Sequence, residues 1–335
     1  MTIHINNSQS SKPRILPQVS RRDFALSAAG FSIAPWLSQL AAAQNTAASD
    51  RLRVLDTHVH FYDPTRPQGI PWPKSDDKLL YRRLLPADYV TALGGSRVDG
   101  VIVVEASSWL EDNQWLLDLA GRERLIAGIV GHLNPDAPEF DRQLKRFAAN
   151  PKFRGIRVGG GTITKKLDDK VFLASMRTMA DKGLTLDVIG NASMLAPVAS
   201  LASKFPSLRI VLNHLAGPGD PAKGIPESWR EGMRTAGAQK NIYCKVSGLV
   251  ELVKSDEPGK SPTSLDYYRE LLDVLWEAMG PERLVYGSNW PVCERGAPLP
   301  AVQKLAMEFF SLQSRETMEE ICWENGRAAY GISNQ

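Results

Sequence analysis

The sequence of 335 residues is poor in cysteine and carries little net charge. Cys244, Cys293 and Cys322 lie far apart and form no C-x-x-C pair, which argues against a disulfide scaffold or a thiolate zinc site. Forty basic residues against 37 acidic ones give a formal net charge of +3, which does not indicate a nucleic-acid surface. With 43% hydrophobic residues, the chain is expected to be globular, as one large α/β domain or two smaller ones.

The first fifty residues have the pattern of an export signal. Ser20-Arg21-Arg22-Asp23-Phe24 precedes a mildly apolar run to Leu40 and then small residues. The paired arginines resemble the twin-arginine signal, an address for the export of folded proteins. We therefore expect a signal peptide and linker in residues 1–50, one domain in residues 51–335 and a periplasmic location. The apolar run is shorter than the about 20 residues that span a bilayer, so tethering by an uncleaved signal is the alternative.

Short apolar and β-branched runs alternate with helical periodicity beyond residue 53. Strands are predicted at 54–57, 100–104, 126–131, 155–158, 184–189, 209–212, 242–246 and 284–286. Helices are predicted at 113–122, 138–149, 171–182, 193–203, 265–279 and 299–311. Eight apolar strands that alternate with helices indicate a closed (β/α)8 TIM barrel.

An open doubly wound sheet is the alternative fold. It is disfavoured because no G-x-G-x-x-G phosphate loop follows the first predicted strand. The three glycines at 159–161 lack that spacing, and we expect them to allow a sharp turn or a close approach of backbone to a ligand.

Polar residues follow the predicted strands at their C-terminal ends, where barrel enzymes carry their sites. His58 and His60 come after the first strand, and alternate residues of a strand point to the same face. His132 follows the third strand and His214 the sixth, so four of the five histidines stand at such ends. This clustering favours a functional site over an exposed edge strand that merely carries two histidines. Further residues at these ends are Glu105, Arg157, Lys245, Ser247 and Asn289.

Five motifs resemble the amidohydrolase superfamily, and in particular its second family, which includes sugar-acid lactonases and 2-pyrone-4,6-dicarboxylate lactonase. The motifs are D-T-H-V-H-F-Y-D-P at 56–64, F-R-G-I-R at 153–157, L-N-H-L-A-G-P at 212–218, K-V-S-G-L at 245–249 and R-L-V-Y-G-S-N-W-P at 283–291. The resemblance spans about residues 53–331 and closes with a segment at 325–331 that is similar to the family's last helix.

The resemblance implies that His58, His60 and His214 bind a metal or polarise the substrate carbonyl. An acid after strand eight usually serves as the general base, but Asn289 stands at that position, and an amide cannot accept a proton at neutral pH. The usual histidine of strand five is absent, and Arg157 stands where a carboxylated lysine would bridge two metals. A two-metal site is therefore not expected, and a metal-independent site remains an alternative.

The same residues allow a single-metal site to be drawn. His58, His60 and His214, with Glu105, could hold one zinc-like ion that polarises an ester carbonyl and acidifies water. Glu105 is alternatively the base, or an acid paired with Lys245 or an arginine. His132 is either the proton donor to the leaving alkoxide or a wall residue.

Arg157, Lys245 and Ser247 are candidates for binding a substrate carboxylate or hydroxyls, because the planar arginine fork in particular matches a carboxylate. Salt bridges at the barrel rim are the alternative role. Three tryptophans in predicted strand-end loops could stack on a sugar or pack in the core: Trp72, Trp109 and Trp290. The proline-rich loop 61–86 is expected to form a pocket wall or a lid.

We therefore predict an exported barrel hydrolase that opens a small lactone, with a sugar-acid lactone of the fuconolactone or rhamnonolactone type as substrate. Two alternatives remain open: a metal-dependent decarboxylase of the same family, and a sugar-binding barrel that has lost catalysis, which Asn289 motivates. The expected partner is a small lactone or carboxylate, without nucleic acid and without stable membrane insertion after signal cleavage.

Overall fold

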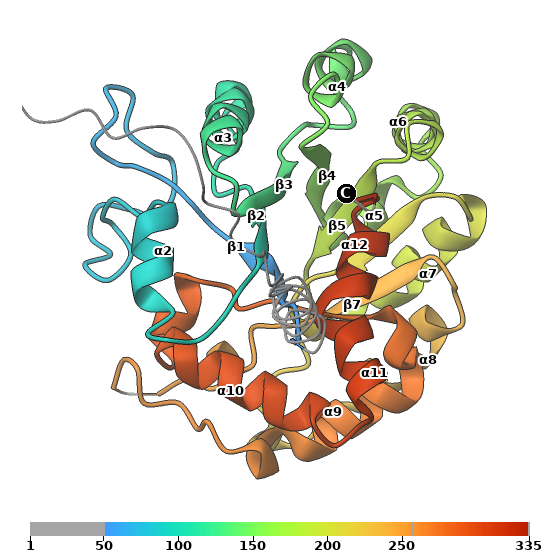
Figure 1. The fold of residues 1–335 in the computed structure, drawn as a ribbon. Coiled ribbons are helices and arrows are strands. Elements are labelled where there is room, and N and C mark those ends of the chain that lie inside the picture. The colour runs from blue at the N-terminus through green and yellow to red at the C-terminus, as the bar shows by residue number, and fades with distance from the viewer. Residues whose placement is uncertain (1–50, 256, 334–335) are drawn as a thin grey trace, which may run out of the picture. The chain divides into compact units, whose positions relative to one another are not determined.

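The computed structural model describes residues 51–255 and 257–333, and the predicted export signal lies outside them. Eight parallel strands follow one another in chain order around a nearly closed barrel (Figure 1). The predicted TIM barrel is confirmed. The strands are β1 (Leu55–Val59), β2 (Gly100–Val104), β3 (Ile126–Gly131), β4 (Phe153–Gly159), β5 (Thr185–Ile189), β6 (Arg209–Leu212), β7 (Ile242–Val246) and β8 (Leu284–Tyr286).

The strands are apolar on both faces because each face packs against a different core. In β2, Val101 and Val103 belong to the large cluster that includes residues of the surrounding helices. Ile102 and Val104 alternate with them and belong to a smaller cluster that includes Tyr330. The smaller cluster therefore fills the barrel interior, which explains the continuous apolar runs in the sequence.

The barrel closes where β1 meets the segment that follows β8. Val59 pairs in parallel with Trp290. The backbone N–H of Asn289 donates to the His58 carbonyl at 2.9 Å, and the backbone N–H of His60 donates to the Trp290 carbonyl at 2.8 Å. This seam brings His58, His60 and Asn289 together although they belong to opposite ends of the barrel's strand order.

Helices surround the strands, as Figure 1 shows. They are α2 (Pro86–Ala92), α3 (Leu110–Arg122), α4 (Phe140–Ala148), α5 (Gly160–Lys166), α6 (Lys170–Asp181), α7 (Leu195–Lys204), α8 (Glu227–Gly237), α9 (Leu265–Met279), α10 (Leu299–Phe310), α11 (Arg315–Glu319) and α12 (Asn325–Ala329). The six predicted helices correspond to α3, α4, α6, α7, α9 and α10.

Among the helices that the periodicity did not reveal, α8 contains two glycines, which have low helix propensity. Close packing explains the glycine at position 232, because a Cβ there would lie 2.7 Å from the Leu195 side chain. At the three glycines 159–161 the chain passes directly from β4 into α5, which agrees with the expected sharp turn. A Cβ at Gly160 would lie 2.4 Å from Met194, so the close approach at this position is to a side chain.

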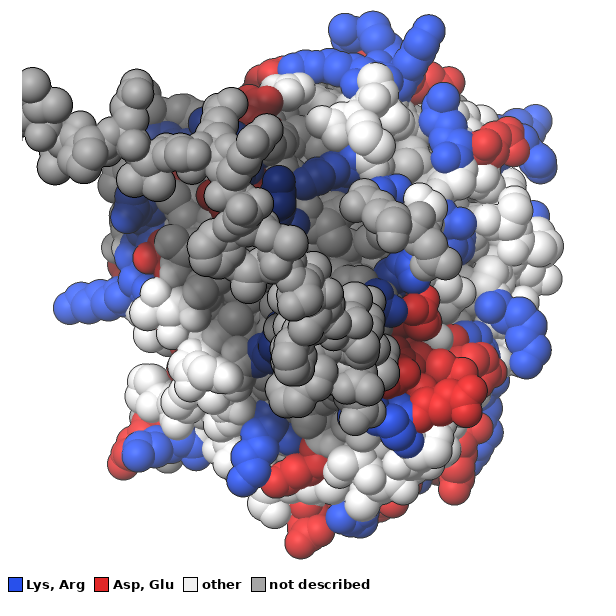
Figure 2. Space-filling model, in the orientation of Figure 1, with Lys and Arg blue, Asp and Glu red and all other residues white. Residues whose placement is uncertain are grey.

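Charges of both signs are interspersed around the rim in Figure 2, and acidic side chains gather where Figure 1 places α8 and α11. Such a mixed surface agrees with the small net charge. Within the described residues, no helix has the length and apolar character needed to cross a bilayer.

Candidate active site

A cleft of about 520 Å³ lies at the C-terminal ends of the strands. The predicted site residues that line it are His60, Trp72, Glu105, Arg157, His214 and Asn289. Ser107 and Ser108 add hydroxyl groups, and Pro71 and Val292 add apolar walls. The loop that was predicted to form a wall does so through Pro71 and Trp72.

The His60 imidazole has a defined tautomer. Its Nδ1 lies 2.9 Å from the Val104 carbonyl oxygen, which can only accept a hydrogen bond, so Nδ1 carries the proton. The lone pair is therefore on Nε2. Burial, together with the charge of Arg157, lowers the pKa of His60 to about 3. His60 is thus a neutral hydrogen-bond acceptor at neutral pH.

His214 is held by an unusual turn after β6. The φ angles of His214, Leu215 and Ala216 are 51°, 55° and 55°, a left-handed conformation that residues with a Cβ adopt at a cost of roughly 1–2 kcal/mol each. The His214 Nδ1 lies 2.9 Å from the Ser247 hydroxyl. A Cβ at Gly248 would lie 2.9 Å from the His214 ring, so only glycine allows this approach.

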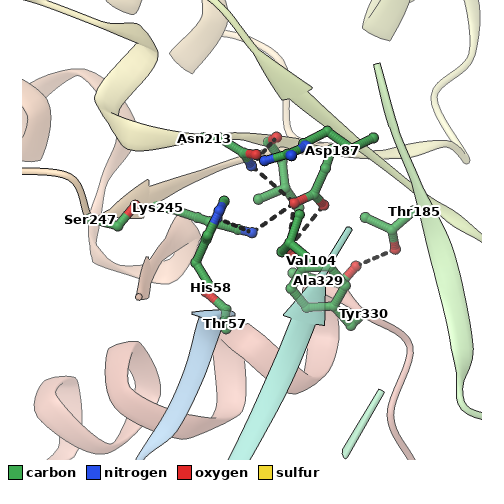
Figure 3. A network of polar contacts seen from close by, with 12 residues as sticks. Thr57, His58, Val104, Thr185, Asp187, Asn213, Lys245, Ser247, Ala329 and Tyr330 are labelled. Atoms are coloured by element: carbon green, nitrogen blue, oxygen red, sulfur yellow. Dashed lines mark hydrogen bonds and ion pairs between the residues drawn. The ribbon is translucent and has the colours of Figure 1, made fainter. Parts of the chain in front are cut away.

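Beneath the cleft, Lys245 joins His58 to Asp187 (Figure 3). The Lys245 Nζ lies 2.7 Å from Asp187 Oδ2 and 3.1 Å from His58 Nδ1. All three side chains are fully buried. The sequence motifs K-V-S-G-L and D-T-H-V-H therefore meet at one ammonium group, which lies under the substrate cleft and does not line it.

The hydrogen bonds around Asp187 define its charge. Asn213 Nδ2 donates to Oδ2 at 2.9 Å, and the Tyr330 hydroxyl donates to Oδ1 at 3.0 Å. A carboxyl group that receives only donors is ionised. Burial lowers the pKa of Lys245, and the charge of Asp187 opposes this. We therefore describe the pair as an ammonium and a carboxylate.

This ion pair decides how His58 can act. Because the ammonium donates to Nδ1, the proton of the neutral His58 ring is on Nε2, an atom that is buried without a hydrogen-bond partner in the described part of the chain. A metal ligand needs a lone pair on the nitrogen that binds the ion. His58 has none to offer while Lys245 is charged.

The three histidines are close, with ring centroids of His58 at 5.0 Å from His60 and 4.3 Å from His214. However, among residues 51–255 and 257–333 no group of three or more His, Cys, Asp or Glu side chains is arranged to hold a metal ion. It is the tautomer of His58, with Nδ1 bound by Lys245 and the proton on Nε2, that does not suit a zinc-like ion at the predicted ligand set.

Two cations act on the buried histidines of the site. Burial lowers the pKa of His58 and of His214 well below the usual value, and the charges of Lys245 and Arg157 lower both further. Cations that disfavour an imidazolium also stabilise a negative charge that develops on a nearby substrate oxygen. The site is therefore suited to the oxyanion of an acyl-transfer reaction.

Glu105 is paired with Arg157. The Arg157 Nε donates to Glu105 Oε1 at 2.9 Å, and Nη2 donates to the Glu105 carbonyl at 2.7 Å. Both side chains are only 13–14% exposed and both line the cleft. Of the alternatives for Glu105, the structure supports pairing with an arginine, and it places Lys245 with Asp187.

The Asn289 side chain is hydrogen-bonded to a carboxyl group. Its φ angle is 60°, a left-handed conformation that asparagine tolerates better than most residues. Asn289 Nδ2 donates to Glu251 Oε1 at 2.7 Å. Burial raises the pKa of the Glu251 carboxyl to about 7. Glu251 belongs to η4 (Val250–Leu252), which follows β7.

Some predicted contact residues lie elsewhere. Trp290 is 1% exposed and packs edge-on against Phe61 and Tyr89 in the core, so of the two roles left open for this ring the structure supports core packing. Trp109 immediately precedes α3 and is not among the residues that line the cleft, whereas Trp72 lines it.

Two of the polar candidates form hydrogen bonds with histidines: Lys245 with His58, and Ser247 with His214. Both are at most 2% exposed, so direct binding of substrate by them is not supported. His132 lines an adjoining pocket of about 320 Å³ that shares Glu105 and Arg157 with the cleft.

Sequence reasoning missed Asp56, Asp187 and Glu251 as parts of the site. Asp56 accepts from the backbone N–H groups of His58 and Ser288 at 3.1 and 2.8 Å, so it fixes the seam. It stands in the D-T-H-V-H motif, which was a usable signal. Asp187 lies within β5 and could have been paired with a lysine by its strand position. Glu251 has no comparable signal, because it lies in a short helix 38 residues before Asn289.

Comparison with known proteins shows the family to which the chain belongs. The family model described as "Amidohydrolase" matches residues 55–332. An L-fucono-1,5-lactonase of Burkholderia ambifaria is 32% identical over 243 residues, covering 71% of this chain and 80% of the relative. A second L-fucono-1,5-lactonase, of Burkholderia multivorans, is 27% identical over 75% of this chain and 86% of the relative.

A solved structure has the same fold. An amidohydrolase from Burkholderia multivorans with bound zinc superposes with a TM-score of 0.76 at 24% identity, covering 84% of this chain and all of that one.

Proposed function

The chain belongs to the amidohydrolase family, and from that premise we propose that it opens a sugar-acid lactone by hydrolysis. The observation that carries the proposal is a cleft in which neutral histidines stand beside buried and half-buried cations. That combination stabilises an oxyanion and still offers an unprotonated acceptor. The names of the two lactonase relatives support L-fucono-1,5-lactone, and the sequence resemblance adds rhamnonolactone.

The substrate carbonyl is the electrophile in this proposal. When water adds to it, the carbonyl oxygen becomes an oxyanion within the positive potential of Arg157 and Lys245. Fixed charges in a buried site need no reorganisation at that moment, which is why they lower the barrier. Lys245 acts from beneath the cleft and Arg157 from its wall.

His60 is the proton acceptor that the hydrogen bonds support. Its Nε2 lone pair takes one proton from water as the oxygen bonds to the carbonyl carbon. The imidazolium then gives this proton to the ring oxygen as the C–O bond breaks and the carbonyl forms again. The product is an open-chain hydroxy acid, and the ring is again neutral.

Binding falls to groups on the cleft wall. Arg157 donates hydrogen bonds to Glu105 and is held in place by it, ready to bind a carbonyl or hydroxyl oxygen. The Trp72 ring, 5.8 Å from the His60 ring, lines the same cleft and offers a surface for the apolar face of a sugar ring.

The zinc of the related structure belongs to that protein. In this chain the His58 tautomer does not suit a metal ligand, so the proposed reaction uses no metal step. Metal-independent hydrolysis was one of the alternatives drawn from the sequence, and it is the one that we propose.

The test is a panel of aldonolactones, including L-fucono-1,5-lactone and L-rhamnonolactones, followed by acid release. We expect turnover that is unchanged after chelation of metal and that is lost in His60→Gln. Release of carbon dioxide from a carboxylated substrate would instead identify a decarboxylase. Binding of sugars without any turnover would identify a degenerate barrel. Loss of activity on chelation, with recovery on adding zinc, would refute the metal-independent reaction.

A further inference from the structure

Glu251 carries a buried carboxyl group behind the cleft for which the reaction above has no use. Its Oε1 accepts from Asn289 Nδ2 at 2.7 Å, and its Oε2 is closed to solvent with no hydrogen-bond partner in the described part of the chain. Glu251 itself lines a second pocket of about 430 Å³, whereas Asn289 lines the cleft. Asn289 is therefore the contact between this acid and the substrate cleft.

The Glu251 carboxylate decides which way the Asn289 amide faces. An ionised carboxyl can only accept hydrogen bonds, so the NH2 group of Asn289 must face it. The amide carbonyl, Oδ1, then faces away from Glu251. Since Asn289 lines the cleft and Glu251 occupies only one of its two NH2 hydrogens, Oδ1 is an acceptor that the side chain can present there.

In this orientation, two residues that line the cleft each supply an acceptor, Asn289 through Oδ1 and His60 through Nε2. A water molecule that donates one hydrogen to each keeps an oxygen lone pair for the carbonyl carbon. Fixing a nucleophile in this way lowers the barrier without any proton transfer to the amide itself.

We propose that Glu251 is a positioning residue for the hydrolysis: its carboxylate holds Asn289 with Oδ1 toward the cleft, where this oxygen orients the attacking water. The proposal rests on the proposed lactonase function. It accounts for a site in which asparagine occupies the position of the family's usual acid. The negative charge is on Glu251 instead, behind Asn289 as seen from the cleft.

The arrangement depends on the charge of Glu251. A protonated Glu251 can donate to Oδ1, which would turn the Asn289 amide and present NH2 to the cleft. Burial raises the pKa of Glu251 to about 7, so this exchange falls in an accessible pH range. The titratable and charged groups that neighbour Glu251 are Tyr268 of α9, Cys293 and Arg295 of η6 (Val292–Arg295), and Lys254.

The first test is Glu251→Gln, assayed for kcat and KM on the best lactone of the panel across pH 5–9. A glutamine has the same size but can present either its oxygen or its nitrogen to Asn289. We expect kcat to fall roughly 10- to 100-fold with little change in KM. The decline of wild-type activity below about pH 7 should be absent from the variant. Unchanged kcat, or a retained acid limb, would overturn the proposal.

The second test restores an acid beside the water. When Glu251→Gln is combined with Asn289→Asp, the glutamine amide introduced at position 251 can donate to the new carboxylate, which then accepts from water directly. We expect kcat of the double variant to exceed that of Glu251→Gln by about tenfold or more. A double variant no better than the single one would mean that Glu251 supports only the local fold, and the proposal would fail.

Glu257→Gln is the matched control, because Glu257 is exposed in the loop that follows η4. It should leave kcat and the pH profile unchanged. If the wild-type protein hydrolyses no lactone, the proposed function fails, and the amide orientation is then tested by NMR of the asparagine side-chain NH2 groups. The Asn289 signals should shift with a midpoint near pH 7 in wild type and not in Glu251→Gln; no shift would overturn it.

Discussion

The Lys245 ammonium lies between Asp187 Oδ2, at 2.7 Å, and His58 Nδ1, at 3.1 Å, and no part of the three side chains reaches solvent. One cation thus neutralises a buried acid and sets the tautomer of a histidine from the H-x-H motif. It also supplies positive potential directly beneath the cleft. Several expected properties of the protein depend on this contact.

Replacing Lys245 by methionine should destabilise the fold and abolish hydrolysis. The substitution leaves the Asp187 carboxylate buried and unpaired, which typically costs about 3–5 kcal/mol. It also frees His58 and removes charge that stabilises the oxyanion. Urea unfolding and the lactone assay measure the two effects.

The control is the double substitution Lys245→Met with Asp187→Asn, which removes both charges. We expect it to recover much of the stability and none of the activity. A double variant as unstable as Lys245→Met would show that the ion pair is not what Lys245 contributes to folding.

Arg157→Lys should weaken substrate binding more than the chemical step. Lysine keeps the charge but cannot form the paired hydrogen bonds that join Arg157 to Glu105, so the group that faces the substrate loses its fixed orientation. We expect KM to rise by about 10- to 100-fold, the equivalent of about one charged hydrogen bond. A steady-state comparison on the same lactone checks this, and an unchanged KM would contradict a binding role.

Glu251→Gln should be more stable than wild type at high pH although it is less active. Burial raises the pKa of Glu251 from 4.5 to about 7, so the folded state keeps a proton that the unfolded chain has lost between these values. The contribution of Glu251 to stability is therefore present below pH 4.5 and lost as the pH rises through 7. The variant should gain about 3 kcal/mol relative to wild type at pH 8. Unfolding free energies at several pH values test this; a pH-independent difference would be the contrary result.

Export through the twin-arginine route is a proposal that rests on the sequence of the first fifty residues. Replacing Arg21 and Arg22 by lysine keeps the charge and removes the paired guanidinium groups. We expect the protein to remain in the cytoplasm, as judged by cell fractionation. Unchanged export of the lysine variant would rule out this route.

Much of the fold could be predicted because its signals are local. Apolar runs and helical periodicity identify the strands and most of the large helices, and the position of a residue after a strand places it at one rim. This brought His60, Glu105, Arg157, His214 and Asn289 to a common cleft. Helix α8 was missed because its glycines are favoured only by close packing, of Gly232 against Leu195 and of Gly237 against the Ala278 backbone.

The charges and proton positions of the site could not be predicted from local sequence patterns, because they depend on which side chains meet across the barrel. For Lys245 the sequence left substrate binding and a salt bridge open, and the folded chain decides for the salt bridge, since Asp187 on β5 holds its ammonium beneath the cleft. For Trp290 the sequence left stacking on a sugar and core packing open, and the ring packs in the core because Phe61 and Tyr89 of α2 meet it there.

Strand periodicity and short motifs were enough to establish the barrel, the family and the rim on which the histidines stand. What those histidines can do depends on contacts that exist only in the folded chain. The tautomer of His58, the lone pair of His60 and the acid behind Asn289 each depend on one hydrogen bond. The partners are 187, 44 and 38 positions apart in the sequence, for Lys245–His58, Val104–His60 and Asn289–Glu251 in that order. Contacts of that range leave no local pattern in a sequence.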